Sequence, residues 1–377
     1  MNKNQKIVIV NQDSGYLMID IANTYHEAGF QVSLITGRLV ERNTPLMAGI
    51  KVKNIIRYTK ESTIQRLFTW ILATIQIWFL LIFKFKNHKV LIVSNPPLAP
   101  LLTLFIPNDV SVLIYDIFPD ALFDAGVMSR KSIICTLWKK MNIKAYAKTK
   151  TIFTISDGMK QVLTQYVTES KIKVVPVWAD NEFLKPINVE KNIFIQKNNF
   201  SGKYIVLYSG NLGKTGDVEC MIEFAKLTKD TDIHYLIIGG GVKSAAIEKS
   251  IRDNNLSNCT LLPWQNSEML PFSLSAASLA VVSLGKNTSN IAMPSKLYSY
   301  LAVGAPVLSL SSNDSDLAKL VTKRDFGKNF EPDKIAEIVK YILFLKSNKV
   351  EHSKFHINSL ETSSLFTKSN AKLFIKN

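Results

Sequence analysis

Short apolar runs alternate with amphipathic stretches along most of the chain. Buried strands of parallel sheets read as apolar runs and the helices between them show a helical period, so this alternation predicts βα units. We expect strands at 6–10, 31–36, 89–94, 110–115, 151–156 and 173–177, then at 204–209, 234–239, 260–262, 279–283 and 306–310. We expect helices at 18–28, 132–148, 218–228, 242–254, 295–303 and 333–346.

The pattern weakens between residues 180 and 201, where the chain is polar and has no clear period. Such a stretch is typical of a connector, and 377 residues exceed the usual size of one domain. We therefore expect an α/β protein of two Rossmann-like domains, at 1–183 and 184–350, followed by a weakly helical tail at 351–377. Such folds bind ligands at the carboxyl ends of their strands.

One segment is far more apolar than the rest. Residues 67–83 read LFTWILATIQIWFLLIF, broken only by Thr69, Thr74 and Gln76, and the basic stretch KFKNHK follows. This length is slightly short for a membrane span. Three interpretations stay open: a helix partly embedded in the membrane interface with its basic flank on anionic lipid, an ordinary core helix, and a true span.

The composition limits the classes of partner that the protein can bind. Lys and Arg number 46 against 30 Asp and Glu, a formal charge of +16, which indicates an anionic partner. The basic residues are scattered and form no nucleic-acid-binding motif, so we expect no nucleic acid. Cys135, Cys220 and Cys259 are widely spaced, which predicts neither disulfides nor a zinc site. The polar N-terminus leads directly into a strand and does not resemble a signal peptide, so a cytoplasmic location fits.

A glycine-rich turn follows the predicted strand at 204–209. The sequence YSGNLGKTGD places Gly210, Gly213 and Gly216 between this strand and a helix, a pattern that lets backbone N–H groups approach a diphosphate. A tight turn without a ligand remains the alternative. A second cluster at 239–241 could line the same nucleotide pocket or only permit a turn.

Lys296 stands in an unusual place. Pro294 and Ser295 read as the start of a helix, with Ser295 a possible cap. Lys296 then falls in the first turn, where a cation is unfavourable unless an anion binds beside it. We therefore expect Lys296 to contact a phosphate, with a solvated surface lysine as the alternative.

These motifs occur in a recognisable order. GNLG opening a helix, GGG after the next strand, LLPWQNSEMLPF and MPSKLYSYLAVGAPVL resemble the donor-binding half of glycosyltransferase family 4. In the first half, IYDIFPDALFDAGVM, ISDGMKQVL and VVPVWADNEFLKP resemble a bacterial O-antigen and capsule subgroup of WbuB type. The similarity runs from residue 8 to about residue 346.

The resemblance implies a GT-B fold, two Rossmann-like domains facing across a cleft, and a retaining transfer without metal or cofactor. It implies a nucleotide-sugar donor, UDP-linked rather than GDP-linked and carrying an amino sugar, and a polyprenyl-diphosphate-linked saccharide acceptor. Peripheral association with the inner face of the bacterial plasma membrane would follow. The matching donor-binding residues are Gly210, Asn211, Leu212, Gly213, Lys214, Gly240, Pro263, Trp264, Pro294, Ser295 and Lys296. Asp116 and Asp120 match the catalytic positions, and Gly15 would give room to the acceptor.

The sequence also departs from the family. Many members carry two glutamates before the Gly-x-Pro-Val turn, and Ile291 and Ser299 stand at those places. Because the second glutamate usually holds the donor ribose, ribose binding must differ here. Asn211 replaces a common arginine, which leaves more of the charge compensation to Lys296 and Lys214. A non-catalytic scaffold and a sugar-nucleotide epimerase therefore remain alternatives.

Overall fold

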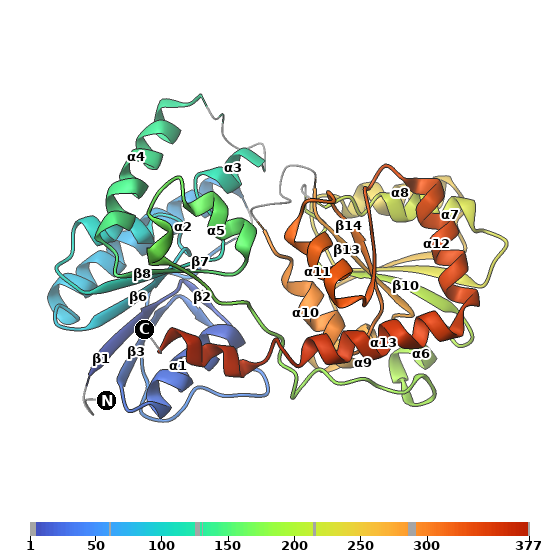
Figure 1. Ribbon diagram of the computed structural model, residues 1–377, viewed down its shortest axis with the longest axis horizontal. Helices are drawn as coiled ribbons and strands as arrows, with labels where there is room; N and C mark the ends of the chain where they lie inside the picture. The colour runs from blue at the N-terminus through green and yellow to red at the C-terminus, as the bar shows by residue number, and fades with distance from the viewer. Residues whose placement is uncertain are drawn as a thin grey trace. The chain divides into compact units, whose positions relative to one another are not determined.

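The computed structural model describes residues 5–59, 62–124, 129, 131–213, 216–285 and 292–375. The chain divides into two compact units, the first comprising Met1–Val177 and Lys368–Asn377 and the second Trp178–Thr367. The division follows Val177, a little before the expected boundary at residue 183, and the last residues return to the first unit. Figure 1 shows this return as the red end of the chain beside α1.

The first unit is built on a seven-stranded parallel sheet with the order β5-β3-β1-β6-β7-β8-β9. Its strands are β1 (Lys6–Val10), β3 (Gln31–Thr36), β5 (Lys51–Asn54), β6 (Lys89–Val93), β7 (Val110–Ile114), β8 (Thr151–Thr154) and β9 (Ile172–Val174). Its helices are α1 (Tyr16–Glu27), α2 (Thr63–Phe79) with the π-helix η1 (Leu80–Lys84), the 3-10 helix η2 (Ala99–Leu104), α3 (Asp120–Asp124), α4 (Ile133–Lys148), α5 (Asp157–Leu163) and, from the chain's end, the 3-10 helix η7 (Lys368–Phe374). Two short strands, β2 (Asp13–Ser14) and β4 (Arg38–Leu39), form a separate pair.

The second unit repeats this design with a six-stranded parallel sheet of order β12-β11-β10-β13-β14-β15. Its strands are β10 (Tyr204–Ser209), β11 (Ile233–Ile238), β12 (Cys259–Leu262), β13 (Leu279–Ser283), β14 (Val307–Leu310) and β15 (Gly327–Phe330). Its helices are α6 (Ile193–Lys197), α7 (Cys220–Leu227), α8 (Ser244–Asp253), α9 (Leu270–Ser275), α10 (Ser295–Ala302), α11 (Asp316–Arg324), α12 (Ile335–Ser347) and α13 (Lys349–Ser363). Figure 1 shows helices on both faces of this sheet.

The strand orders determine where each unit can bind a ligand. β1 lies between β3 and β6, and β10 lies between β11 and β13. In each sheet the chain first adds strands on one side of this central strand and later adds strands on its other side. Such a switch point leaves a crevice at the carboxyl end of the strand. The expected fold class of two Rossmann-like domains is confirmed, and the loops after β1 and β10 carry Gly15 and Gly210.

Several elements differ from the prediction, and three of them have a clear physical reason. The strands β5 (KVKN) and β15 (GKNF) are too polar to stand out, because β5 and β15 lie at the edges of their sheets. The expected weak tail is in fact the helix α13, capped by the side chain of Asn348, which accepts from the Glu351 N–H at 3.0 Å. Its buried face includes Ser359, Thr362 and Ser363, so it has no apolar period to detect.

The apolar segment at 67–83 lies in α2 and η1. Its buried face carries Ala73, Ile77 and Leu81, and every exposed residue between 67 and 83 is apolar. The polar interruptions are used internally: Gln76 Oε1 accepts from the Ile56 N–H at 2.7 Å, and the threonine hydroxyls donate to backbone carbonyls one turn earlier. Among the described residues, one helix, Ile64–Lys84, is long and apolar enough to cross a membrane by length and composition.

Candidate functional site

Two glycine turns of the second unit are joined backbone to backbone. The Gly210 N–H donates to the Ile238 carbonyl at 2.9 Å, and the Leu212 N–H donates to the Gly240 carbonyl at 3.0 Å. A Cβ added to Gly239 would collide with the Gly210 carbonyl oxygen, which is backbone and cannot move aside. The glycines at these positions are therefore required for the turns after β10 and β11 to approach each other.

The Asn211 side chain lies between two further glycines. A Cβ added to Gly213 would lie 2.8 Å from Asn211 Nδ2, and one added to Gly241 would lie 3.0 Å from its Oδ1. Asn211 is exposed at the mouth of the turn, whereas the Leu212 side chain is fully buried, so only the Leu212 backbone can serve a ligand. Lys214 falls outside the described residues.

The helix α10 brings Lys296 to these turns. Its Nζ lies 3.6 Å from the centroid of the Tyr208 ring, and a Cβ added to Gly210 would lie 2.6 Å from the same nitrogen. The expectation of Ser295 as a helix cap is wrong. Ser295 is the first helical residue, and Pro294 precedes it as a cap without a side-chain hydrogen bond, because a proline side chain offers no acceptor.

Lys296 is partly buried beside the helix N-terminus, and desolvation lowers its pKa to about 7. In the described part of the second unit, no carboxylate lies within ion-pair distance of its Nζ. A nearby lysine, Lys243, is neutralised by Glu219 at 2.8 Å. Lys296 is thus a partly desolvated cation whose charge a bound anion can balance.

Trp264 extends the site toward the end of β12. Its side chain is 58% exposed, and a Cβ added to Gly240 would lie 3.1 Å from the indole Nε1. Pro263, also exposed, directly precedes it. An exposed indole against a glycine turn offers a flat face on which a nucleotide base can stack.

Sequence reasoning missed the tyrosines that support these residues. The Tyr208 hydroxyl donates to the Asn211 carbonyl at 2.9 Å, and the Ser209 N–H donates to the Tyr300 hydroxyl at 2.6 Å. Both side chains are almost completely buried. Both tyrosines occupy apolar positions, one of a strand and one of a helix, so the sequence pattern assigned them to the core. Only the structure shows that they lie beside Gly210 and Lys296 and support the site.

The first unit holds the other predicted residues. Gly15 precedes α1, and no described atom lies within 4 Å of a Cβ added there, so the loop is open at this point. Beside it, Asp13 and Arg38 form a bidentate ion pair with both N–O distances at 2.6 Å. This pair joins β2 to β4 and supports the loop.

Asp116 and Asp120 are in different states. Asp116 is exposed after β7, and desolvation by the surrounding protein raises the pKa of its carboxyl group. Asp120 is mostly buried, with one oxygen 2.9 Å from Lys139 Nζ and the other accepting from the Tyr166 hydroxyl. Asp116 is available to a ligand, whereas Asp120 is bound to its neighbours.

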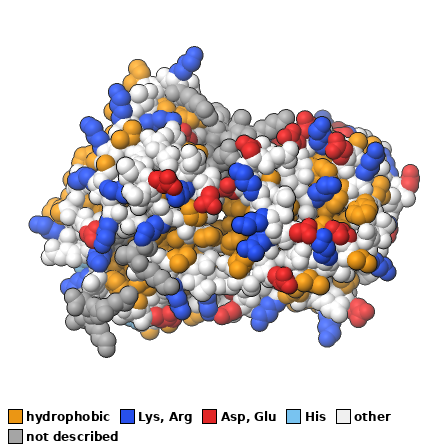
Figure 2. All heavy atoms as spheres, in the orientation of Figure 1, with side chains coloured by type: hydrophobic (Ala, Val, Ile, Leu, Met, Phe, Trp, Pro, Cys, Tyr) orange, Lys and Arg blue, Asp and Glu red, His pale blue; other side chains and the backbone are white. Residues whose placement is uncertain are grey.

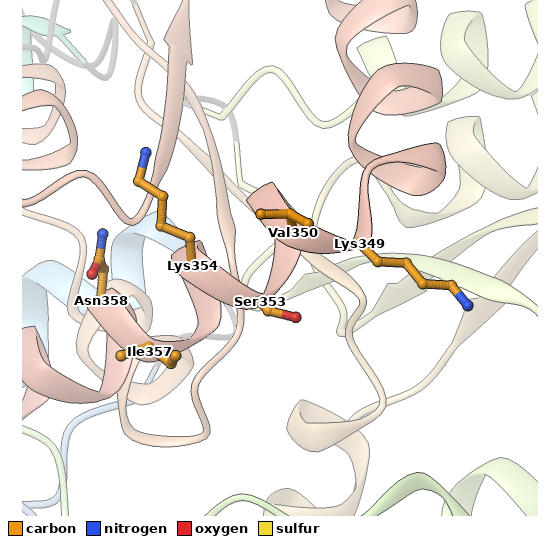
Figure 3. A pocket seen from close by; sticks show the side chains of 6 residues that line it. All are labelled: Lys349, Val350, Ser353, Lys354, Ile357 and Asn358. Carbon is orange, nitrogen blue, oxygen red and sulfur yellow. The ribbon is translucent and has the colours of Figure 1, made fainter.

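The structure thus brings Gly210, Asn211, Gly213, Gly240, Trp264 and Lys296 together in the second unit, whereas Gly15, Asp116 and Asp120 belong to the first. Among the described residues, no group of three His, Cys, Asp or Glu side chains could hold a metal ion. A surface hollow of about 570 Å³ on α13 contains none of the predicted site residues (Figure 3). Its Lys354 is paired with Asp325 at 2.7 Å.

The second unit matches a known family. Residues 189–361 match the family described as Glycosyl transferases group 1. The two units have the GT-B fold of two Rossmann-like domains, which the solved structure of the glycosyltransferase WaaG shares.

Two curated relatives are similar to this chain. The probable glycosyltransferase WbjE of Pseudomonas aeruginosa is 23% identical over 262 residues, which cover 68% of this chain and 66% of the relative. The putative colanic acid biosynthesis glycosyl transferase WcaI of Escherichia coli K12 is 30% identical over 193 residues, 50% of this chain and 47% of the relative. The matches therefore span less than two thirds of either relative.

Solved structures share the fold across nearly the whole chain. Anabaena HepE in complex with UDP superposes with a TM-score of 0.73 at 12% identity, covering 99% of this chain and 98% of that one. WaaG, a glycosyltransferase involved in lipopolysaccharide biosynthesis, superposes with a TM-score of 0.69 at 14% identity, covering 95% of both chains.

Proposed function

We propose that this protein transfers a sugar from a UDP-linked donor to a lipid-linked saccharide in the assembly of a bacterial surface polysaccharide. The transfer retains the anomeric configuration and uses no metal and no cofactor. The polysaccharide context rests on the named relatives, one in colanic acid and one in lipopolysaccharide biosynthesis. UDP as the nucleotide is supported by HepE, whose structure contains UDP. An N-acetylated amino sugar is the donor group we would test first.

One observation carries the donor site: the partly buried ammonium of Lys296, which lies against the turn of Gly210. A buried charge is expensive unless an opposite charge meets it. The N-terminus of α10 adds backbone N–H groups that favour an anion at the same point. A nucleotide diphosphate matches both, with its phosphates at Lys296 and its base toward Trp264.

The chemistry follows from the charges. As the bond between the sugar C1 and the diphosphate oxygen breaks, negative charge grows on the leaving group, and Lys296 stabilises it. The acceptor oxygen forms its bond to C1 on the same face, and its proton passes to the departing phosphate. In the first unit, Asp116 is the proposed catalytic residue that is exposed to a ligand. Asp120 supports the segment from its ion pair with Lys139.

Calorimetry with UDP and GDP, each with EDTA present, tests the donor site. We expect UDP to bind, GDP to bind more weakly, and Lys296→Met to reduce UDP affinity about a hundredfold, as removal of a charged hydrogen-bond partner does. Lys226→Met, which removes an exposed lysine paired with Glu223, is the matched control. Binding of neither nucleotide would favour the non-catalytic scaffold, and turnover of donor without acceptor would favour the epimerase.

We also propose that the first unit rests on the membrane that carries the acceptor. The exposed side of α2 and η1 presents Leu67, Phe68, Ile71, Ile75, Phe79 and Phe83. The first turns of α4 expose Ile133, Ile134 and Leu137. Figure 2 shows apolar and basic side chains close together where Figure 1 labels α4. Apolar side chains beside lysines are typical of interfacial binding.

The positions of lysines and of aromatic rings in the first unit support this membrane contact. The ammonium of Lys53 lowers the pKa of Lys84, so lysines from β5 and η1 gather at the end of the apolar helix, where they can meet anionic lipid. The Phe118 ring lies 6.1 Å from Trp70 of α2 and 6.1 Å from Trp138 of α4. Because Phe118 stands between Asp116 and Asp120, the helices proposed to meet the lipid are packed against the candidate catalytic segment.

Sedimentation with lipid vesicles tests the membrane proposal. We expect binding to vesicles containing phosphatidylglycerol, weaker binding to neutral vesicles, and loss of binding in a Phe79→Glu, Phe83→Glu double variant. Leu227→Glu, at an equally exposed apolar residue of the second unit, should bind normally. Equal binding by the double variant and the control would rule out α2 as the contact.

A further inference from the structure

Tyr208 and Lys296 form a close pair inside the candidate donor site. The Nζ of Lys296 lies 3.6 Å from the ring centroid, well within the range of a cation–π interaction. The ring is only 3% exposed, and its hydroxyl donates to the Asn211 carbonyl at 2.9 Å. The face that meets the ammonium is therefore held in one orientation.

Lys296 needs such a support. A lysine side chain is long and flexible, and the N-terminus of α10 repels its charge. No carboxylate of the described second unit forms an ion pair with it. The negative face of the Tyr208 ring attracts the ammonium of Lys296.

Gly210 completes the arrangement. A Cβ at this position would lie 2.6 Å from the Nζ and 2.9 Å from the Cε of Lys296. The lysine therefore lies directly against the glycine turn, between the turn and the ring. The ring fixes where the positive charge stands relative to the backbone that faces the donor.

We propose that Tyr208 is a positioning residue for the donor diphosphate, which holds the ammonium of Lys296 charged and in place over Gly210. The inference rests on the proposed function, because it takes Lys296 as the phosphate contact. It adds the buried ring that Lys296 Nζ contacts, which influences both the position and the protonation of the lysine.

The proposal predicts the sign of a pH effect. The ring favours the charged form of Lys296, whereas burial favours the neutral form. Weakening the ring's negative face, with its shape retained, lowers the pKa of Lys296 further. UDP affinity then falls at a lower pH than in the protein with an unmodified ring.

The test replaces Tyr208 with phenylalanine and with trifluorophenylalanine, which share a shape and differ in the charge of the ring face. UDP binding is measured by calorimetry from pH 6 to pH 9. Both replacements lose the hydroxyl's hydrogen bond to the Asn211 carbonyl, so the Tyr208→Phe protein is the reference for the fluorinated one. The fluorinated ring should move the pH midpoint of binding downward and reduce affinity at pH 8 about fivefold. Tyr208→Met, which removes the ring, should shift it in the same direction.

The same two replacements at Tyr204 are the control, because Tyr204 lies on the same strand and face of β10 and contacts His352 rather than a lysine. Equal pH profiles for the phenylalanine and trifluorophenylalanine proteins would overturn the role of Tyr208. The proposed function fails separately, if the unmodified protein binds neither nucleotide or if Lys296→Met binds UDP normally.

Discussion

The lysine at position 296 carries most of the chemistry expected of the second unit. Burial lowers its pKa to about 7, so near neutral pH the free protein holds a mixture of charged and neutral lysine. A bound diphosphate favours the charged form. Donor binding is therefore coupled to the uptake of a proton.

This coupling predicts a pH dependence with a definite sign. Below about pH 7 the lysine is already charged, so its titration no longer changes the affinity for UDP. Above it, each binding event must also protonate Lys296, so affinity should fall by up to about tenfold per pH unit. Calorimetry at pH 8 in buffers of different ionisation enthalpy should show proton uptake. Lys296→Arg, whose charge does not titrate in this range, should show none. Proton uptake by both the unmodified protein and Lys296→Arg would contradict the assignment of Lys296 as the group that is protonated when UDP binds.

Alanine substitutions at two neighbouring glycines should have different effects on stability and on UDP binding. In Gly239→Ala the new Cβ meets the backbone oxygen of Gly210, so we expect the free energy of unfolding to fall by about 2 kcal/mol or more. In Gly240→Ala it meets Trp264, an exposed side chain that can move, so stability should change by less than about 0.5 kcal/mol. The displaced indole should weaken UDP binding. Thermal unfolding and calorimetry separate the two effects, and equal destabilisation would contradict this reading of the turns.

At the scale of elements, α13 shows why a polar helix belongs in this fold. His356 Nδ1 is 2.7 Å from the Gly304 carbonyl, and the Ser359 hydroxyl donates to the Ala305 carbonyl at 2.9 Å. Asn358 Nδ2 donates to the Asp325 carbonyl at 2.6 Å. Gly304 and Ala305 lie just after α10, and Asp325 is the C-cap of α11, so these three carbonyls have no helical hydrogen-bond partner. The polar side chains of α13 supply those partners.

Removal of one such partner should be measurable. We expect Asn358→Ala to lower the free energy of unfolding by about 1 kcal/mol, the net contribution of one hydrogen bond. Figure 3 shows Ser353 pointing to another side of α13 from Asn358, and Ser353→Ala is the control with no expected effect. Chemical denaturation measures both. A Ser353→Ala loss as large as that of Asn358→Ala would refute the capping role.

At the scale of the whole molecule, the chain's last segment belongs to the unit in which the chain began. Phe374 of η7 packs against Phe153 with ring centroids 4.7 Å apart, and its carbonyl accepts from the Tyr25 hydroxyl at 2.8 Å. The first unit is therefore complete only when residues on both sides of the second unit have folded.

Truncation of this buried ring tests the connection. We expect Phe374→Ala to lower the free energy of unfolding of the first unit by about 3 kcal/mol, as for other buried phenylalanines. Leu373→Ala, at a neighbouring side chain that is exposed, should cost much less. Unfolding of the first unit is followed by fluorescence or calorimetry. If Phe374→Ala leaves this transition unchanged, η7 contributes little to the stability of the first unit.

The sequence alone indicated the inner strands of the two parallel sheets, because strands covered on both faces must be apolar. It also indicated the glycine turns and Lys296, since a glycine series after a strand and a cation in a first helical turn are local features. The WbuB-type subgroup, the amino sugar and the lipid-linked acceptor stay predictions.

Only the tertiary structure decided which side chains act together. Tyr208 reads as core in a strand, and its meeting with Lys296 depends on the pairing of β10 and the entry of α10. Asp120 reads like Asp116, yet only Asp120 meets Lys139 and Tyr166. The strands β5 and β15 and the helix α13 owe their structure to neighbours that supply hydrogen bonds, and no local pattern records a neighbour that is distant in sequence.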